Sequence, residues 1–148
     1  MANIIFPSNT REIINAIRGA IGRIVYFTYV ASSASCTTCV LDPVTGTSTD
    51  SFCPECSGLY WIPIWSSMPI SGHVTWGKHD VLKWESVGQY FDGDCRVQIE
   101  YTPENVVIVD NTQKTGYVKV DGKELEIKSR IFRGVKELNR ILVNLIEK

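Results

Sequence analysis

The chain has 148 residues, 44% of them hydrophobic and 21% charged, which is the composition of an ordinary globular protein with a single domain over residues 1–148. No apolar run approaches the length of a membrane-spanning helix, and the first residues lack a basic segment followed by an apolar run, so we expect neither a membrane span nor a secretory signal. The 15 basic and 16 acidic residues give a net charge of -1, which argues against a dedicated binder of duplex DNA.

The first predicted element is an α-helix over residues 9–22. Asn9 is suited to cap it, with Glu12 three residues later as in a capping box. Four isoleucines at helical spacing share one stripe of this helix: Ile13, Ile14, Ile17 and Ile21. The following residues, 23–30, are β-branched and aromatic, which predicts a strand.

Residues 31–58 differ in character, because Ser, Thr, Cys, Pro, Asp and Gly dominate there. A loop of this length without structure of its own is uncommon in a compact domain. We therefore expect something other than a strand ladder to organise the segment, and its four cysteines are the candidates.

From residue 59 onward the pattern is a series of short strands separated by turn signals. Pro63 marks the first of them as an edge strand or a bulged strand. The expected strands cover residues 59–65, 73–76, 81–85, 95–101 and 106–109. The regular alternation over 95–101 predicts one buried and one solvated face, with Cys95 as a small buried apolar residue.

Residues 116–128 form the clearest hairpin, because Asp121-Gly122 suits a two-residue type I′ turn. That register pairs Val118 with Leu125 on one face and Lys119 with Glu124 on the other. The last segment has two possible structures. Residues 140–146 could form a closing strand, or the segment could be a helix, because helical spacing is shown by Val135, Leu138, Leu142 and Leu145. Short strands with frequent turns predict a mostly β fold, a small barrel or sandwich over residues 59–148, with an N-terminal helix and a metal-binding loop insertion.

The motif that carries chemistry is a pair of Cys-x-x-Cys hooks, Cys36 with Cys39 and Cys53 with Cys56. Two such hooks on a polar loop can place four thiolates on one tetrahedron, the geometry that zinc prefers. Four protein ligands fill the coordination shell, so we predict one structural zinc ion per chain rather than a catalytic one. Two disulfides or free thiols are the alternatives, and disulfides would suit a secreted protein. Gly58 follows the second hook and lets the backbone fold closely, whereas Leu41 stands at that place after the first.

Other candidate groups are more simply explained by structure. His73 and His79 could serve as ligands or bases, and Asp80, Asp92 and Asp94 could form an acidic cluster, but a surface or turn role fits each better. Five aromatic side chains could stack single-stranded bases, although a barrel core is favoured for them because few basic residues lie among them: Tyr60, Trp61, Trp65, Trp76 and Trp84. With no phosphate-binding Gly loop, no His-Glu-x-x-His and no nucleophile elbow, we predict that the chain is not an enzyme.

Charge is spread unevenly along the chain. Residues 1–110 carry 6 basic and 11 acidic residues, and residues 111–148 carry 9 basic and 5 acidic residues. This split is explained either by ordinary variation along a solvated surface or by complementary faces that meet between neighbouring subunits.

The segment 36–58, with Cys-x-x-Cys, Asp-Pro-x-Thr-Gly-x-Ser and Cys-Pro-x-Cys-x-Gly, resembles a zinc-hook insertion in small virion proteins of tailed bacteriophages. Those proteins are head–tail connector components of the neck, head-closure or adaptor type, and residues 116–140 are similar to the closing part of their β-barrel. The resemblance implies a virion protein that forms a ring with copies of itself between portal or adaptor and tail proteins. DNA would pass through the lumen without being read. The alternative is a zinc-ribbon module that binds nucleic acid or a protein partner, which a steep salt dependence of single-strand binding would reveal.

Overall fold

The structure, a computed structural model, describes residues 7–77, 94–134 and 139–147. Over these residues it is a mostly β fold with two helices, and the fold class predicted from the sequence is confirmed. In chain order the elements are α1 (Thr10–Ile21), β1 (Arg23–Ser35), β2 (Trp61–Trp76), β3 (Cys95–Glu100), α2 (Pro103–Thr115), β4 (Tyr117–Val120), β5 (Lys123–Arg133) and β6 (Arg140–Glu147).

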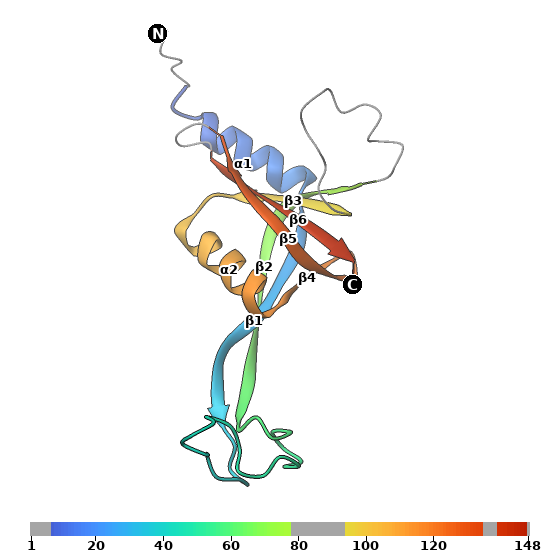
Figure 1. The fold of residues 1–148 in the computed structure, drawn as a ribbon. Coiled ribbons are helices and arrows are strands. Elements are labelled where there is room, and N and C mark those ends of the chain that lie inside the picture. Colours follow the sequence, from blue (N-terminus) through green and yellow to red (C-terminus); the bar gives the residue numbers. More distant parts are fainter. Residues whose placement is uncertain (1–6, 78–93, 135–138, 148) are drawn as a thin grey trace.

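Six antiparallel strands close into a barrel in the order β1-β2-β3-β6-β5-β4, with β4 returning to β1 (Figure 1). The interior is filled by apolar side chains from all round the wall, among them Val25, Phe27, Val97, Leu125 and Val143, each fully buried. The barrel includes β1, so it begins at Arg23, before the cysteine segment, and not at residue 59 as the sequence suggested.

Two sequence predictions for the wall are confirmed. Along β3 the burial alternates as expected, with Cys95, Val97 and Ile99 inside the barrel. The β4–β5 hairpin has the predicted register, with Val118 opposite Leu125 and Lys119 opposite Glu124. Its turn residues Asp121 and Gly122 have φ values of 49° and 82°, as a type I′ turn requires.

The C-terminal segment, left open between strand and helix, is strand β6. It pairs with β3 on one side and β5 on the other, and it therefore belongs to the barrel wall. The predicted strand 81–85 lies outside the described residues, as do residues 135–138. Within the described ranges, no helix is long and apolar enough to cross a membrane.

Residues 106–109, predicted as a strand, lie instead in helix α2, so that prediction is wrong. The helix begins at Thr102, whose hydroxyl accepts a hydrogen bond from the Asn105 amide at 3.1 Å, and Pro103 occupies its first turn. A run of four apolar residues is too short to show the period of a strand or of a helix. Here the N-cap at Thr102 makes the run helical. Ile108 and Val109 pack against the barrel core.

Helix α1 forms where expected, but its predicted capping box does not. Asn9 makes no side-chain capping bond, because its backbone angles (φ -91°, ψ 3°) are not those of an N-cap, and the first turn is tied by the Thr10 amide to the Pro7 carbonyl instead. The helix is joined to the barrel through polar groups, with Arg11 and Asn15 both reaching Glu100 on β3. None of its residues is buried.

Strands β1 and β2 continue beyond the barrel as a two-stranded ribbon that carries residues 36–60 at its end (Figure 1). We call residues 29–66 the arm, and residues 36–60 its tip. The predicted loop 31–58 is therefore wrong at its start, since residues 31–35 are strand, and the two strands predicted over 59–65 and 73–76 are one strand, β2. Pro63 lies where β2 pairs with β1 alone, which agrees with the edge position predicted for it.

Two of the tryptophans predicted for the barrel core lie outside it, contrary to the sequence interpretation. Trp61 and Trp65 lie on the arm and are 46% and 51% exposed. Trp76 is half-buried and packs against the core, and Trp84 lies outside the described residues. Trp61 and Trp65 lie on the ribbon beyond the barrel, where there is no barrel interior for them to enter.

Candidate metal centre

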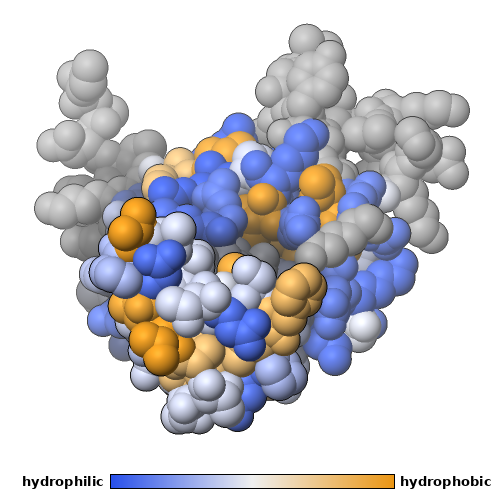
Figure 2. Space-filling view, turned by 60° about the horizontal axis from the view of Figure 1, so that its bottom comes forward, coloured by the Kyte–Doolittle hydropathy of each residue, from blue (hydrophilic) through white to orange (hydrophobic). Residues whose placement is uncertain are grey.

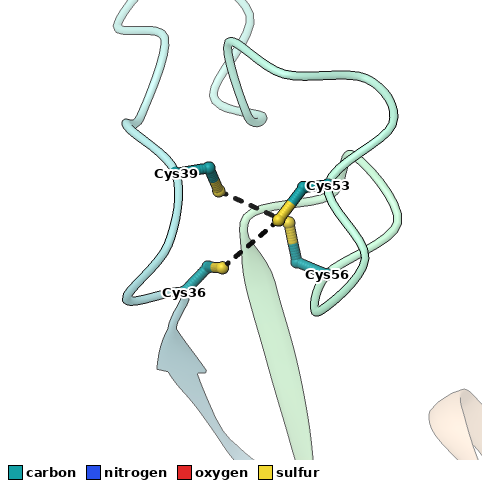
Figure 3. Close-up of side chains that lie close together, drawn as sticks. All are labelled: Cys36, Cys39, Cys53 and Cys56. Atoms are coloured by element: carbon teal, nitrogen blue, oxygen red, sulfur yellow. Dashed lines mark hydrogen bonds between the residues drawn. The ribbon is translucent and has the colours of Figure 1, made fainter.

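The tip brings the four cysteines of the two hooks together. Their sulfur atoms all lie within 4.8 Å of one another and point toward a common centre (Figure 3). The Sγ atoms of Cys36 and Cys53 are 3.7 Å apart, and those of Cys39 and Cys56 are 3.5 Å apart. A tetrahedral metal with bonds to sulfur of about 2.3 Å places its ligand atoms about 3.8 Å apart. The arrangement therefore fits a four-sulfur metal site.

All five cysteines of the chain are free, so the hooks are not joined by disulfides. Cys36, Cys53 and Cys56 are buried and Cys39 is half-buried. This small cluster is separate from the barrel core and is covered by Tyr60 and Ile62. The tip thus has an interior made almost wholly of thiols, which pack too little apolar surface to hold a segment of 25 residues together unaided.

The backbone around each hook is shaped by short-range hydrogen bonds. The first hook starts where β1 ends, and the Cys36 amide donates to the Tyr60 carbonyl at 2.8 Å across the ribbon. In the second hook, Ser57 and Leu59 amides donate to the carbonyls of Cys53 and Cys56 at 2.9 and 3.0 Å. The two hooks are therefore positioned by opposite strands of one ribbon.

Gly58 is required at its position for two reasons. Its φ is +83°, in the region that favours glycine. A Cβ there would also lie 2.8 Å from the Ser51 carbonyl oxygen. The close approach predicted for this glycine is thus to the loop backbone preceding Cys53.

Between the hooks, residues 42–47 form a turn. The Gly46 amide donates to the Asp42 carbonyl at 2.8 Å, and the Asp42 carboxylate accepts from the Val44 amide at 2.9 Å. That backbone bond lowers the pKa of Asp42, so the carboxylate is charged at neutral pH. Leu41 and Ser48 then form an isolated β-bridge, which returns the chain toward the second hook.

Polar side chains beside the sulfurs were not identified from the sequence. The Thr38 hydroxyl lies 3.2 Å from the sulfurs of both Cys36 and Cys53. The Glu55 carboxylate accepts from the Thr37 and Thr38 hydroxyls at 3.4 and 3.2 Å. Thr37, Thr38 and Glu55 could have been identified from the sequence by their positions inside the two Cys-x-x-Cys hooks, because the two residues between paired ligands lie close to a bound ion.

The thiols differ in acidity. Hydrogen bonding from the Thr38 hydroxyl, followed by the backbone amide of Cys56, lowers the pKa of Cys53 to about 6. For Cys39 the Ser48 hydroxyl acts in the same direction, but burial and the other three cysteines outweigh it and raise the pKa to about 12. At pH 7 the metal-free cluster thus holds Cys53 as a thiolate and Cys39 as a thiol.

This difference predicts proton release on metal binding. A metal ligates thiolates, so at pH 7 it must displace the Cys39 proton. The affinity for the metal therefore rises with pH between the pKa values of Cys53 and Cys39, and it falls when Cys53 is protonated near pH 6. We expect at least one proton per metal bound at pH 7. Isothermal titration calorimetry in buffers of different ionisation enthalpy measures it, and binding heats independent of the buffer would contradict the expectation.

The remaining candidate residues do not join this site. His73 lies in β2 opposite Gln98 of β3. Asp94 accepts a hydrogen bond from the Glu147 amide at 2.9 Å, and Cys95 is buried in the barrel, where burial raises its pKa to about 12. His79, Asp80 and Asp92 lie outside the described residues.

Comparison of the chain with protein-family models, with curated proteins and with solved structures returns no match.

Proposed function

We propose that this chain is a structural protein of a tailed-phage neck, which forms a ring in the head–tail connector and carries one structural zinc ion at the tip of its arm. The observation that carries the proposal is the four-cysteine tip held away from a closed barrel by a two-stranded ribbon. The ribbon beyond the barrel is about seven residues long on each strand, or about 20 Å. Such an arm is long enough to reach a neighbouring subunit.

Zinc is the ion that we propose for this donor set. Four thiolates in a tetrahedral arrangement suit Zn²⁺ or an iron–sulfur centre. A full set of protein ligands leaves no position for a substrate, which makes the role structural. In this proposal the ion gives the tip a fixed shape, and the chain has no catalytic activity.

The tip exposes apolar side chains, which would be unfavourable on an arm that contacts no other protein. Phe52 is 93% exposed, Val44 is 91% exposed, and Val40 and Leu59 are 69% and 61% exposed. Hydrophobic groups stand among polar ones on the end of the molecule that faces the viewer in Figure 2. Exposed apolar groups clustered on a rigid projection are typical of a protein–protein contact.

The charge of the arm disfavours the alternative of a nucleic-acid module. Residues 24–77 contain no Lys or Arg, while the tip carries Asp42, Asp50 and Glu55. Four thiolates with one divalent ion would add two further negative charges. Nucleic-acid binding relies on cations that meet phosphates, and the tip offers none.

A basic protein surface is the complementary contact for such a tip, and one is present on this chain. Strands β4, β5 and β6 are neighbours in the barrel and together carry six Lys or Arg and three Asp or Glu residues. The uneven charge of the sequence thus separates into an acidic arm and a more basic side of the barrel wall. If the arm of each subunit contacted the barrel wall of the next, and the same contact were repeated by rotation, the subunits would close a ring.

In the proposed virion, portal or adaptor proteins and tail proteins would lie on either side of the ring, and DNA would cross its lumen without sequence reading. A lumen does not need base-specific contacts. Filter binding to single-stranded nucleic acid tests the alternative: strong affinity with a steep salt slope would favour the module over the ring.

The arm contact can be tested at Phe52. We expect Phe52→Asp to weaken assembly at least about tenfold, because a charge would enter a desolvated contact. Sedimentation velocity over a concentration series measures this. Val107→Asp is the matched control, since Val107 is an exposed apolar residue on α2 and is not part of the tip. Equal assembly of both variants and the wild type would contradict a contact at the tip.

A further inference from the structure

We infer that four arginines on the outside of the barrel form a binding site for phosphate groups, presented either by a nucleic-acid backbone or as free phosphate. We call them the arginine cluster: Arg11 and Arg18 of α1, Arg133 at the end of β5 and Arg140 at the start of β6. The site lies on one chain, so the inference goes beyond the proposed function and does not depend on the ring. Figure 1 shows α1 and the arm tip on opposite sides of the barrel, which separates the cluster from the metal centre.

Helix α1 turns a polar face toward the barrel. Because an α-helix has 3.6 residues per turn, Arg11, Asn15 and Arg18 fall within about 60° of one another around its axis. Arg11 Nη2 donates to Glu100 Oε1 at 2.9 Å, and the Asn15 amide donates to the same oxygen at 3.4 Å. These two contacts hold the polar face of α1 over the end of β3, and Arg18 lies on that face.

The barrel wall brings the other two arginines to the same place. Arg140 of β6 is directly opposite Glu100 of β3 on one side and directly opposite Arg133 of β5 on the other. Residues paired in this way share one face of a sheet. The next residue, Ile141, is buried in the core, so this row of three side chains lies on the outer face of the wall.

The cluster contains more positive than negative charge. Glu100 is its one carboxylate among the described residues, and the ion pair of Glu100 is with α1. Within the same part of the chain, Arg18 and Arg133 form no ion pair, and Arg140 donates to the neutral amide oxygen of Gln98 at 3.3 Å. Four guanidinium groups are therefore gathered around a single carboxylate.

This arrangement is unfavourable in the free chain. Like charges directly opposite each other on neighbouring strands are destabilising, and Arg133 and Arg140 are such a pair. Burial lowers the pKa of Arg18, and the positive charge of Arg140 lowers this pKa further, so the helix arginine also lies within electrostatic reach of the pair. A bound anion would offset the repulsion among these cations.

Phosphate is the anion that suits this set. A guanidinium group donates to phosphate oxygens in a planar, bidentate geometry. A carboxylate brings one charge, whereas free phosphate brings up to two, and a nucleic-acid strand brings one phosphate for about every 3.4 Å of its length. Cations spread over a helix and two strands match such a repeated charge better than a single carboxylate. The acidic arm tip of another copy is the competing occupant.

Arginine side-chain NMR of the full, metal-loaded chain tests the site directly. Titration with sodium phosphate at constant ionic strength should shift three Nε–Hε signals, those of Arg18, Arg133 and Arg140. Arg23 and Arg130 are internal controls, because each is already paired with an aspartate, and their signals should stay in place. Equal shifts of all these signals, or the same shifts with sodium chloride, would overturn the site.

Arg133→Gln combined with Arg140→Gln distinguishes the two sources of phosphate. If the source is a nucleic-acid backbone, the double variant should bind two DNA duplexes of unrelated sequence at least about fivefold more weakly than wild type, equally for both. The slope of affinity against salt should also fall by about two. If the source is free phosphate, the wild type should bind phosphate but neither duplex, and the double variant should lose the shift at Arg18. Fluorescence anisotropy at several salt concentrations measures duplex binding.

Lys119→Gln combined with Lys123→Gln is the matched control, because it removes the same charge from the hairpin of β4 and β5. It should leave the binding of phosphate and of duplexes unchanged. Phosphate should raise the thermal midpoint of this control and of wild type, and not that of the arginine variant. An equal loss of binding in both double variants would reduce the effect to net charge and overturn the site.

The outcomes separate this inference from the proposed function. Cys53→Ser should keep phosphate binding, because the cluster is not part of the tip, and loss of binding there would overturn the site. An arginine variant that binds phosphate like wild type but no longer assembles would assign these arginines to the arm tip of another copy, which overturns the inference and keeps the ring. A wild type that binds phosphate through the cluster but stays monomeric would support the inference and contradict the ring.

Discussion

Cys53→Ser is expected to abolish metal binding and to disorder residues 36–60 while the barrel remains folded. Structural zinc contributes on the order of 10 kcal/mol in small zinc-binding folds, and the tip has only a thiol cluster with Tyr60 and Ile62 as its interior. The barrel core is a separate cluster, so it should keep its stability. Elemental analysis gives the metal content, and hydrogen exchange resolves the tip from the barrel.

Cys95→Ser is the matched control, because Cys95 is a buried cysteine of the barrel and not of the tip. It should keep the metal and lower the free energy of unfolding of the barrel by about 1–3 kcal/mol, since a hydroxyl would be buried in an apolar core. Unchanged metal content and tip protection in Cys53→Ser would contradict the metal centre. Loss of metal in Cys95→Ser would contradict the independence of tip and barrel.

Phe27→Ala is expected to lower the free energy of unfolding by about 3–5 kcal/mol. Phe27 is fully buried and is among the largest side chains of the barrel core. Small domains are stable by only about 5–15 kcal/mol, so this single change removes a large share. Denaturant unfolding followed by circular dichroism measures it.

Trp65→Ala provides the comparison, since its side chain is an aromatic one on the paired strand but is 51% exposed. Its cost should be well below that of Phe27→Ala, about 1 kcal/mol or less, as for changes outside the core. If Trp65→Ala were as costly as Phe27→Ala, the tryptophans would belong to the core after all, and the position of the arm would be wrong.

Where local chemistry determines the outcome, the sequence was sufficient. The type I′ turn at Asp121-Gly122 requires positive φ at both residues, and that requirement set the register of the whole hairpin. The alternation over β3 needed only one buried face. The four cysteines were identified by spacing, and they lie together because both hooks start from one ribbon.

Where longer-range packing determines the outcome, the sequence was misleading. Residues 106–109 have no period of their own, and the N-cap at Thr102 made them helical. The aromatic residues of the arm suggested core, because composition cannot show that a strand continues past its barrel. For α1 the isoleucine spacing predicted the helix but not which of its faces is exposed: Ile13, Ile17 and Ile21 are each more than half exposed, and Arg11 pairs with Glu100 of β3.

Native mass spectrometry of the full chain, combined with elemental analysis, tests the proposed ring and its metal site in one experiment, because it reports metal per chain and copies per particle together. We expect one zinc ion per chain in a closed oligomer, and release of the metal by a chelator should loosen that oligomer. A metal-free chain, or a zinc-loaded chain that stays monomeric alone and with portal or tail proteins, would contradict it.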